Sequence, residues 1–530
     1  MRADDWTLPY PSTRQPACGD DVVATSQPLA VAAGLAQLEA GGNAVDAALA
    51  AALALTVVEP TSNGIGGDLF AIVAEPDGTV RGLNASGRAP RGLDVERLRG
   101  EAEMPRLGWD AVTVPGAPSG WAALAADGAT RSLTELARPA VRLAREGFPV
   151  SPVTAAAWAR AERRFADWPA FADTFLPGGR APRPGQRIAL PDHAATLERL
   201  AESEGEALYR GALGERLVAH ARDTGGALRE DDLASHQPEW VATLTRDVGG
   251  LRVHELPPNG QGVAALIALG ILERTDVAER DPDDPLALHW QIEATKHALA
   301  DARREVADPD RMRLQPRALL ARERLDARAA ALAHDRAGDP GHGRPAVGGT
   351  VFLVAADREG RAVSLIQSNY EGFGSGVVVP GTGIALHNRG AGFSTDPAHP
   401  GVVTPGARPF HTIIPAMATD QAGVPRSAFG VMGGPMQAQG HVQMACRSIL
   451  AGQGPQAAID APRWRVDAGR RVALEPGMPS AIRRDLARRG HDVVIDAPEG
   501  FGGAQAAVAL AQGGWAAASD PRKDGHAAAR

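Results

Sequence analysis

The middle of the chain contains Gly348-Gly349-Thr350-Val351-Phe352-Leu353-Val354-Ala355-Ala356-Asp357, in which two glycines precede a threonine and β-favouring residues follow it. Val351–Ala356 predicts a strand, and a second β-rich run, Ala362–Gln367, follows after a short polar turn. The two runs predict a hairpin that places Thr350 at the head of a strand and returns Ser368 close to it.

Thr350 would gain its own general base if the chain were cut before it. A threonine hydroxyl is a poor nucleophile at neutral pH, but an amino-terminal threonine carries an α-amine with an intrinsic pKa of roughly 8. To create that terminus, the hydroxyl attacks the carbonyl of Gly349 and gives an ester that water hydrolyses. Glycine leaves this carbonyl sterically open. The pattern predicts an N-terminal-nucleophile amide hydrolase, although Gly-Gly-Thr before a strand also occurs as an ordinary loop entering a sheet.

Composition restricts the function classes. The chain has 530 residues, 44% of them hydrophobic, which is enough for a large α/β body or two to three domains. Its only two cysteines, Cys18 and Cys446, provide neither a disulfide framework nor a Cys-rich zinc site, which indicates a reducing compartment. A net charge of −8 without a Lys/Arg-rich run argues against nucleic acid as the main partner. A small molecule is therefore the expected substrate.

Neither export nor membrane insertion is expected. Residues 1–9 carry acids and a proline where a signal peptide needs a basic start and an apolar run. The most apolar stretch, Ala47–Val58, is too short to span a bilayer and predicts a buried helix. We therefore expect a cytoplasmic protein.

Glycine, proline and capping residues predict where the first two helices begin and end. A helix through Val31–Leu38 ends at Gly41-Gly42, and Asn43 or Asp46 starts an alanine-rich helix that ends before Glu59. Because their side chains are small, the two helices are expected to pack closely.

Further along the chain, Asp68–Val73 and Val80–Asn84 predict a hairpin around an Asp-Gly turn. Residues 130–250 are expected to be helical because they are rich in Ala, Arg, Leu and Glu. Residues 335–348 have no apolar period and predict a flexible surface segment, as a cleavage junction requires.

From about residue 24 to residue 525, ordered motifs resemble the γ-glutamyltransferase (glutathione hydrolase) family. Besides the Thr350 segment, these are Ala40-Gly41-Gly42-Asn43-Ala44-Val45-Asp46-Ala47-Ala48, Ser62-Asn63-Gly64-Ile65-Gly66-Gly67-Asp68, Val114-Pro115-Gly116, Leu256-Pro257-Pro258-Asn259-Gly260-Gln261-Gly262, Glu293-Ala294-Thr295-Lys296-His297-Ala298-Leu299-Ala300-Asp301 and Ser519-Asp520-Pro521-Arg522-Lys523-Asp524-Gly525.

The resemblance implies a four-layer αββα Ntn-hydrolase fold that needs no cofactor. It also implies one precursor, cut between Gly349 and Thr350 into a large subunit, 1–349, and a small subunit, 350–530. A dimer of such heterodimers is compatible with it. The partner would be a small-molecule amide that bears a carboxylate.

Some family residues transfer directly. Thr350 falls on the nucleophile, and Ser368 falls on the hydroxyl residue that supports it. Arg88, in Gly87-Arg88-Ala89-Pro90, resembles the arginine that pairs with the substrate carboxylate, a task that suits the planar guanidinium.

Other positions depart from the family pattern. The residues that hold the substrate ammonium are replaced by Tyr370, Arg389 and Gly392, and the carboxylate-binding serine pair by His411 and Thr412. The oxyanion glycines are replaced near Gly434, Met436 and Gln437, a change that main-chain N–H groups tolerate. Loss of acidic partners and gain of an arginine favour a purely anionic head over a zwitterionic one.

Competing constellations are weaker. His289, Glu293 and His297 share one helical stripe and could bind a metal, but ordinary core or solvent-facing histidines explain them more simply, so no metal is expected. Gly64-x-Gly66-Gly67 lacks the third glycine of a dinucleotide fingerprint. No Gly-x-Ser-x-Gly elbow occurs.

Three function hypotheses remain. The first is a γ-glutamyl hydrolase or transferase acting on glutathione-like compounds. The second is an amidohydrolase or acylase for anionic acyl groups without an α-amine, such as glutaryl side chains of β-lactams or oxamate. The third is a non-catalytic binding protein, which would have little use for both Thr350 and Ser368.

Overall fold

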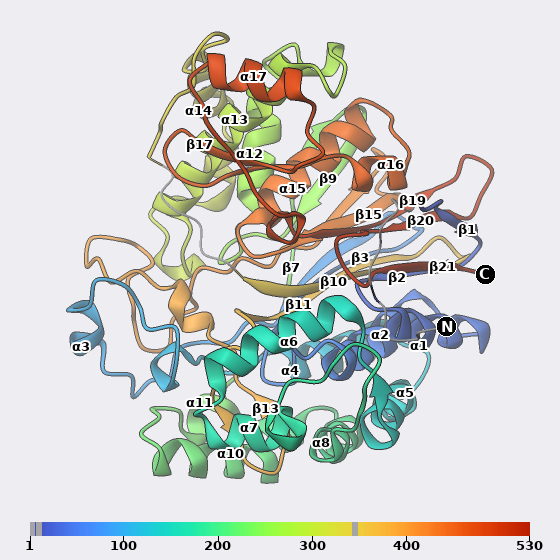
Figure 1. Ribbon diagram of the computed structural model, residues 1–530, viewed down its shortest axis with the longest axis vertical. Helices are drawn as coiled ribbons and strands as arrows, with labels where there is room; N and C mark the ends of the chain where they lie inside the picture. Colours follow the sequence, from blue (N-terminus) through green and yellow to red (C-terminus); the bar gives the residue numbers. More distant parts are fainter. Residues whose placement is uncertain (1–5, 7–12, 342–347) are drawn as a thin grey trace.

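Two seven-stranded antiparallel sheets pack face to face between helical layers (Figure 1). The computed structural model describes Trp6, residues 13–341 and residues 348–530. The first sheet has the order β21 (His526–Ala529), β2 (Val22–Thr25), β10 (Gly349–Ala356), β11 (Ala362–Tyr370), β3 (Asp68–Ala74), β4 (Val80–Asn84) and β7 (Glu239–Val241). The second has the order β1 (Ala17–Gly19), β20 (Trp515–Ser519), β19 (Gly503–Ala509), β15 (Pro425–Met432), β14 (Ala416–Thr419), β9 (Leu251–Glu255) and β8 (Leu244–Val248).

Helices cover the outer face of each sheet, which confirms the expected αββα arrangement. The first sheet is covered by α1 (Pro28–Glu39), α2 (Ala44–Val58), α4 (Ala117–Gly128), α5 (Leu133–Glu146) and α8 (Pro191–Glu202). The second is covered by α12 (Gly262–Leu272), α13 (Pro285–Glu305), α14 (Arg322–Ala330) and α15 (Met436–Met444). Outside these layers lie α6 (Pro152–Phe165), α7 (Pro169–Phe175), α10 (Ala212–Asp223) and α17 (Ser480–Arg488).

The strand β10 shows why a sheet forms here. Its side chains alternate, so that Val351, Leu353 and Ala355 join the helix-side core while Phe352 and Val354 join the core between the sheets. Between the sheets, Gly430 leaves room for the Phe352 ring, because a Cβ at Gly430 would lie 2.6 Å from a ring carbon. The strand that carries Thr350 is therefore buried on both faces.

The paired helices α1 and α2 form as predicted. The side chain of Asn43 accepts hydrogen bonds from the N–H groups of Val45 and Asp46, and Asp46 accepts one from the N–H of Asn43. The close approach depends on Gly34, where a Cβ would lie 2.8 Å from the carbonyl oxygen of Ala47.

The predicted hairpin at Thr350 is confirmed, with Val351 opposite Gln367 and a bulge before it. The helical expectation for 130–250 is wrong in two places. The short strands β5 (Phe148–Pro149) and β6 (Arg187–Ile188) pair inside this range, and β7 and β8 lie within residues 239–248, because each depends on pairing that local composition does not reveal. Of the predicted flexible segment, 342–347 lie outside the described residues. Within residues 335–341, the main-chain N–H of Ala337 donates to the carbonyl of Arg489, and that of Gly338 donates to Glu293.

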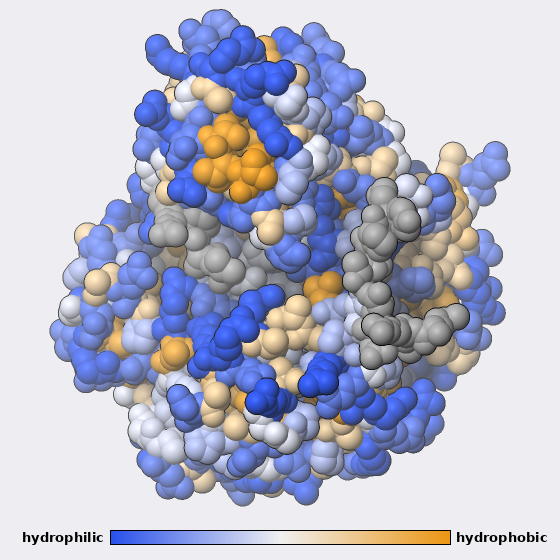
Figure 2. Space-filling model, viewed as in Figure 1, coloured by the Kyte–Doolittle hydropathy of each residue, from blue (hydrophilic) through white to orange (hydrophobic). Residues whose placement is uncertain are grey.

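Cys18 is exposed and Cys446 is buried, and both are free thiols. Among the described helices, none combines the length and apolarity needed to cross a bilayer. Figure 2 shows a face covered mainly by hydrophilic side chains, apart from a compact apolar patch on its upper lobe.

Candidate active site

The hairpin brings Thr350 and Ser368 together inside the protein. Both side chains are almost fully buried, and Thr350 Oγ1 lies 3.2 Å from Ser368 Oγ. Ser368 Oγ donates a hydrogen bond of 2.6 Å to the carbonyl oxygen of Gly349. The main-chain N–H of Tyr370 donates to the same Oγ at 2.8 Å. Because Ser368 uses its proton on Gly349, the Thr350 hydroxyl must be the donor to Ser368. The hydrogen bonds therefore run in one direction, from the Thr350 hydroxyl to the Ser368 hydroxyl and on to the Gly349 carbonyl.

Tyr370 holds an unusual backbone conformation directly after Ser368. Its φ is +72°, a value that side chains larger than glycine rarely adopt. Such strain concentrates at functional sites, where the surrounding structure enforces it. Here it aims the Tyr370 N–H at Ser368 and places the tyrosine ring over a buried guanidinium.

That guanidinium belongs to Arg389, which is completely buried. Its Cζ lies 4.2 Å from the centre of the Tyr370 ring, and its Nη1 donates to Thr412 Oγ1 at 2.9 Å. Its Nε and Nη2 have no acceptor among the described residues. Burial lowers the pKa of Arg389 to about 10, so it remains cationic at neutral pH. Two buried charged donors without partners are costly unless an anion occupies the site.

His411 lies next to Thr412 in sequence but faces the opposite way. Its Nε2 lies 3.0 Å from Asp68 Oδ2, and the main-chain N–H of Ile413 donates to its Nδ1. The imidazole is therefore neutral, with the proton on Nε2, and burial lowers its pKa to about 3. Burial opposes ionisation of Asp68, but His387 and the hydrogen bond from His411 outweigh it and lower the Asp68 pKa to about 2. His411 thus pairs with Asp68 rather than facing the cavity, while Thr412 lines it.

The predicted oxyanion segment lies at the start of α15. The main-chain N–H groups of Met436 and Gln437 donate to the carbonyls of Gly433 and Gly434, at 3.2 and 3.1 Å. The side chain of Gln437 points to the nucleophile instead, with Nε2 3.4 Å from Thr350 Oγ1. The predicted oxyanion segment therefore lies beside Thr350. Its N–H groups at Met436 and Gln437 are already in use, whereas that of Gly434 has no acceptor among the described residues.

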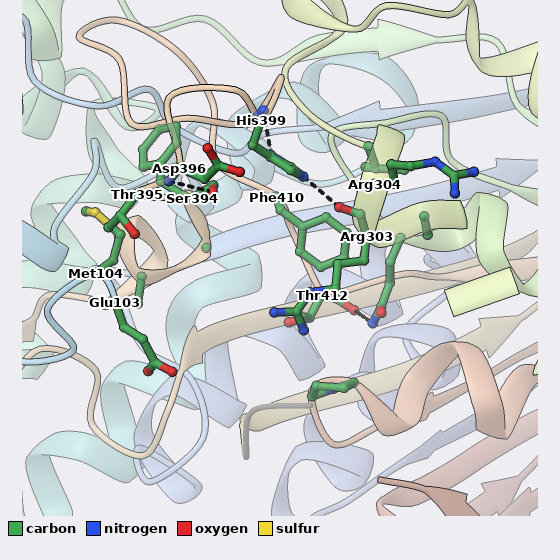
Figure 3. A pocket seen from close by; sticks show the side chains of 18 of the residues that line it. Glu103, Met104, Arg303, Arg304, Ser394, Thr395, Asp396, His399, Phe410 and Thr412 are labelled. Atoms are coloured by element: carbon green, nitrogen blue, oxygen red, sulfur yellow. Dashed lines mark hydrogen bonds between the residues drawn. The ribbon is translucent and has the colours of Figure 1, made fainter. Parts of the chain in front are cut away.

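A cavity of about 600 Å³ adjoins this cluster (Figure 3). Arg303, Arg304 and Phe410 lie on one side of it, and Glu103 and Met104 lie opposite. Its other lining residues include Arg106, Gln261, Leu299, Val306, Tyr370, Gly392, Phe393, Ser394, Asp396, His399, Thr412 and Pro435. Arg389 is not among the lining residues, but its guanidinium contacts Tyr370 and Thr412, which are. The volume suits a ligand of drug size.

Arg88 lies elsewhere. Its guanidinium donates to Asp308 at 2.9 Å and to the carbonyl of Gly406, and it is not among the residues that line the cavity. The placement gives no support to the predicted carboxylate contact, because the ion pair with Asp308 occupies Arg88. Sequence reasoning missed Arg106, which does line the cavity and pairs with Glu371. No local motif marked it, because that pairing joins residues 265 positions apart.

The potential metal ligands assemble differently from the helical stripe. His289 and Glu293 lie with His491 rather than His297. The ammonium of Lys296 lies 2.8 Å from Glu293 Oε1 and 3.4 Å from His491 Nδ1, so this cluster already contains a cation. The carboxylate and Lys296 also hold the main chain of residue 338, which anchors the segment before the junction.

Comparison with known proteins gives consistent matches over the whole chain. The family model described as Gamma-glutamyltranspeptidase matches residues 30–530. The oxamate amidohydrolase proenzyme of Klebsiella pneumoniae is 37% identical, over 94% of this chain and 96% of that protein. The acylase ACY 1 proenzyme of Pseudomonas sp. (strain SE83) is 32% identical, over 97% and 94%. The crystal structure of cephalosporin acylase from Bacillus halodurans superimposes with a TM-score of 0.95 and 44% identity, over 100% and 99%.

Proposed function

Because the chain belongs to the gamma-glutamyltranspeptidase family of Ntn hydrolases, we propose that it cleaves itself before Thr350 and then hydrolyses amides of carboxylate-bearing acyl groups that lack an α-amine. Arg389 is the observation that carries the acyl specificity. The proenzyme names of the relatives support the self-cleavage.

Self-cleavage follows from the directed chain of hydroxyl groups. Thr350 Oγ1 attacks the carbonyl carbon of Gly349 while its proton passes to Ser368 Oγ, and the Ser368 proton passes to the carbonyl oxygen. The resulting tetrahedral intermediate is neutral. It collapses by breaking the Gly349–Thr350 C–N bond, with a proton moving to the nitrogen, and leaves an ester on Oγ1. That bond cleavage frees the Thr350 α-amine. Water then hydrolyses the ester, which frees the Thr350 hydroxyl and leaves Gly349 with a carboxylate.

Turnover repeats this chemistry on a substrate. The free α-amine takes the proton from Oγ1 as the hydroxyl attacks the acyl carbon, and returns it to the leaving amine. Water then attacks the acyl-threonine ester, with the same amine as general base. In the precursor, the main chain of Gly348 lies against Tyr370 and Gly434. Cleavage therefore frees space beside Tyr370 and Gly434.

The charges of the head-group site favour an anion without an ammonium. Arg389 presents two unpartnered nitrogens beside Tyr370 and Thr412. Glu371, the carboxylate next to Tyr370, is already paired with Arg106 and Arg164. An ammonium beside Arg389 would face a buried cation, and the carboxylate next to Tyr370 is already paired, which disfavours a γ-glutamyl head.

The relatives support the same choice. Oxamate is an anion without an α-amine, and acylases and an oxamate amidohydrolase stand among the most similar proteins. The cavity of about 600 Å³ exceeds the needs of oxamate, which favours a substrate with a sizeable amine. A γ-glutamyl hydrolase or transferase is the second candidate, favoured by the family match itself.

Matched anilides test the acyl specificity. Glutaryl and γ-glutamyl p-nitroanilides differ only in the α-amine, and we expect kcat/KM to be at least about tenfold higher for the glutaryl compound, equivalent to ~1.4 kcal/mol. Oxamate serves as the small-anion extreme. Arg389→Met should abolish the preference, because it removes the charge and keeps the apolar stem. A tenfold preference for the γ-glutamyl compound would establish the second candidate instead.

A further inference from the structure

The side-chain amide of Gln437 has one available orientation. It is completely buried, and its Oε1 accepts a hydrogen bond of 3.0 Å from the main-chain N–H of Ile414. A main-chain N–H can only donate, so the oxygen must face Ile414 and the NH₂ must face Thr350. Among the described residues, Thr350 Oγ1 is the one acceptor for this NH₂. The protein thus fixes a neutral donor against its nucleophile.

In the same segment, the main-chain N–H of Gly434 has no acceptor among the described residues, but those of the next two donors are in use. The N–H groups of Met436 and Gln437 donate to Gly433 and Gly434, in turns that open α15. Gly434 is held in turn by Gln261, whose Nε2 donates to its carbonyl oxygen at 3.1 Å and to that of Thr412 at 2.7 Å. Freeing these main-chain donors would require the anchored turn to open.

We propose that the Gln437 side-chain amide is an oxyanion donor for acyl transfer to Thr350. As Oγ1 bonds to the acyl carbon, the carbonyl electron pair moves onto oxygen, and that oxygen comes within reach of the Nε2 donor beside Oγ1. The separation of 3.4 Å to Oγ1 in the precursor leaves space for the acyl group to enter. Hydrogen bonds of this kind tighten only in the transition state.

This inference rests on the proposed role of Thr350 but not on the proposed acyl specificity. The test therefore uses p-nitrophenyl acetate, a neutral ester that requires no carboxylate site, and measures the rate of Thr350 acylation by nitrophenol release and mass. In Gln437→Glu, one carboxylate oxygen still accepts from Ile414 while the other replaces the donor with an acceptor. We expect acylation about 10²–10³-fold slower than in the wild type, the effect of losing one oxyanion donor.

Two further readouts separate catalysis from structure. The rate ratio of Gln437→Glu to wild type should rise as the pH falls, because a protonated carboxyl regains an O–H donor. Gln439→Met is the matched control: Gln439 is also buried in α15, but its amide bonds to Val466. This control should melt at a lower temperature, yet the folded enzyme should acylate within about threefold of the wild-type rate.

Self-cleavage should continue in Gln437→Glu, because the Gly349 carbonyl already accepts from Ser368. A variant that stays one chain, or that acylates within about threefold of the wild type at all pH values, overturns the assignment. If Gln437→Glu does not fold, Gln437→Met gives the same comparison with a neutral side chain of similar volume. A wild type that reacts with the ester but hydrolyses no anilide contradicts only the acyl specificity.

Discussion

At the residue scale, Ser368 connects the scissile carbonyl to the nucleophile. It accepts from Thr350, donates to Gly349 and is oriented by the N–H of Tyr370. Replacing it with alanine removes both the proton path and the donor on the carbonyl oxygen. We expect Ser368→Ala to slow self-cleavage by about 10²–10³-fold, measured as the appearance of two fragments over time on denaturing gels.

Two further variants serve as controls for this measurement of self-cleavage. Ser368→Thr keeps a hydroxyl and should recover most of the cleavage rate, whereas Thr350→Ala should remain one chain indefinitely. Cleavage of Ser368→Ala at the wild-type rate would show that the proton takes another route, and would remove Ser368 from the mechanism.

The site residues differ in how far sequence could predict them. Thr350 and Ser368 were predictable because hairpin register brings them together over 18 positions. The partners of Arg88 and His411 were not, because Asp308 and Asp68 lie 220 and 343 positions away and no local pattern records those contacts. The resemblance located residues at aligned positions, but only packing decided which way each side chain faces.

At the element scale, prediction succeeded where a signal was local. The capping box at the start of α2 and the alternation of β10 depend on neighbouring residues, so both could be inferred. The short strands β7 and β8 could not, since they exist through pairing with β4 and β9. The same distinction applies to residues 335–341, whose anchor on Glu293 and Lys296 comes from a distant helix.

The end of α2 carries a testable electrostatic feature at Glu59. Burial is the main cause that raises its pKa to about 7, against a hydrogen bond from Ser26 that lowers it. The folded state therefore binds the proton more tightly than the unfolded state, whose carboxyl has its usual pKa near 4.5. Stability from this group is fully present below about pH 4.5 and is lost as the pH rises through about 7.

Glu59→Gln should remove this pH dependence while keeping an acceptor for Ser26. In a Thr350→Ala background, which keeps one chain, the melting temperature of Glu59→Gln relative to its parent should rise between pH 5 and pH 8. The corresponding change in the free energy of unfolding is on the order of 3 kcal/mol once Glu59 is fully ionised in the parent. Glu39→Gln, at an exposed helix end, is the control for the Glu-to-Gln exchange itself. A flat difference for Glu59→Gln would contradict the raised pKa.

At the scale of the whole molecule, the predicted cleavage site divides the chain but not the sheets. In the first sheet, β10 and β11 lie between β2 and β3, and β2 also pairs with β21. In the second sheet, β14 pairs with β9, and β20 pairs with β1. Residues 1–349 and 350–530 therefore each supply strands to both sheets, and neither piece contains a complete one.

This interleaving predicts that the two fragments remain one folded unit after cleavage. Separating them would expose the edges of β2, β3, β10 and β11 and open the apolar cores that both fragments share, at a cost comparable to unfolding. Native mass spectrometry of the processed protein should give the mass of the intact chain plus one water per pair of fragments, while denaturing conditions should release both. Uncleaved Thr350→Ala should have the same hydrodynamic radius as the processed pair of fragments. Separation of the fragments in native buffer, or native-like folding of either fragment alone, would contradict this prediction, because the hydrogen-bond partners of each piece's strands lie in the other.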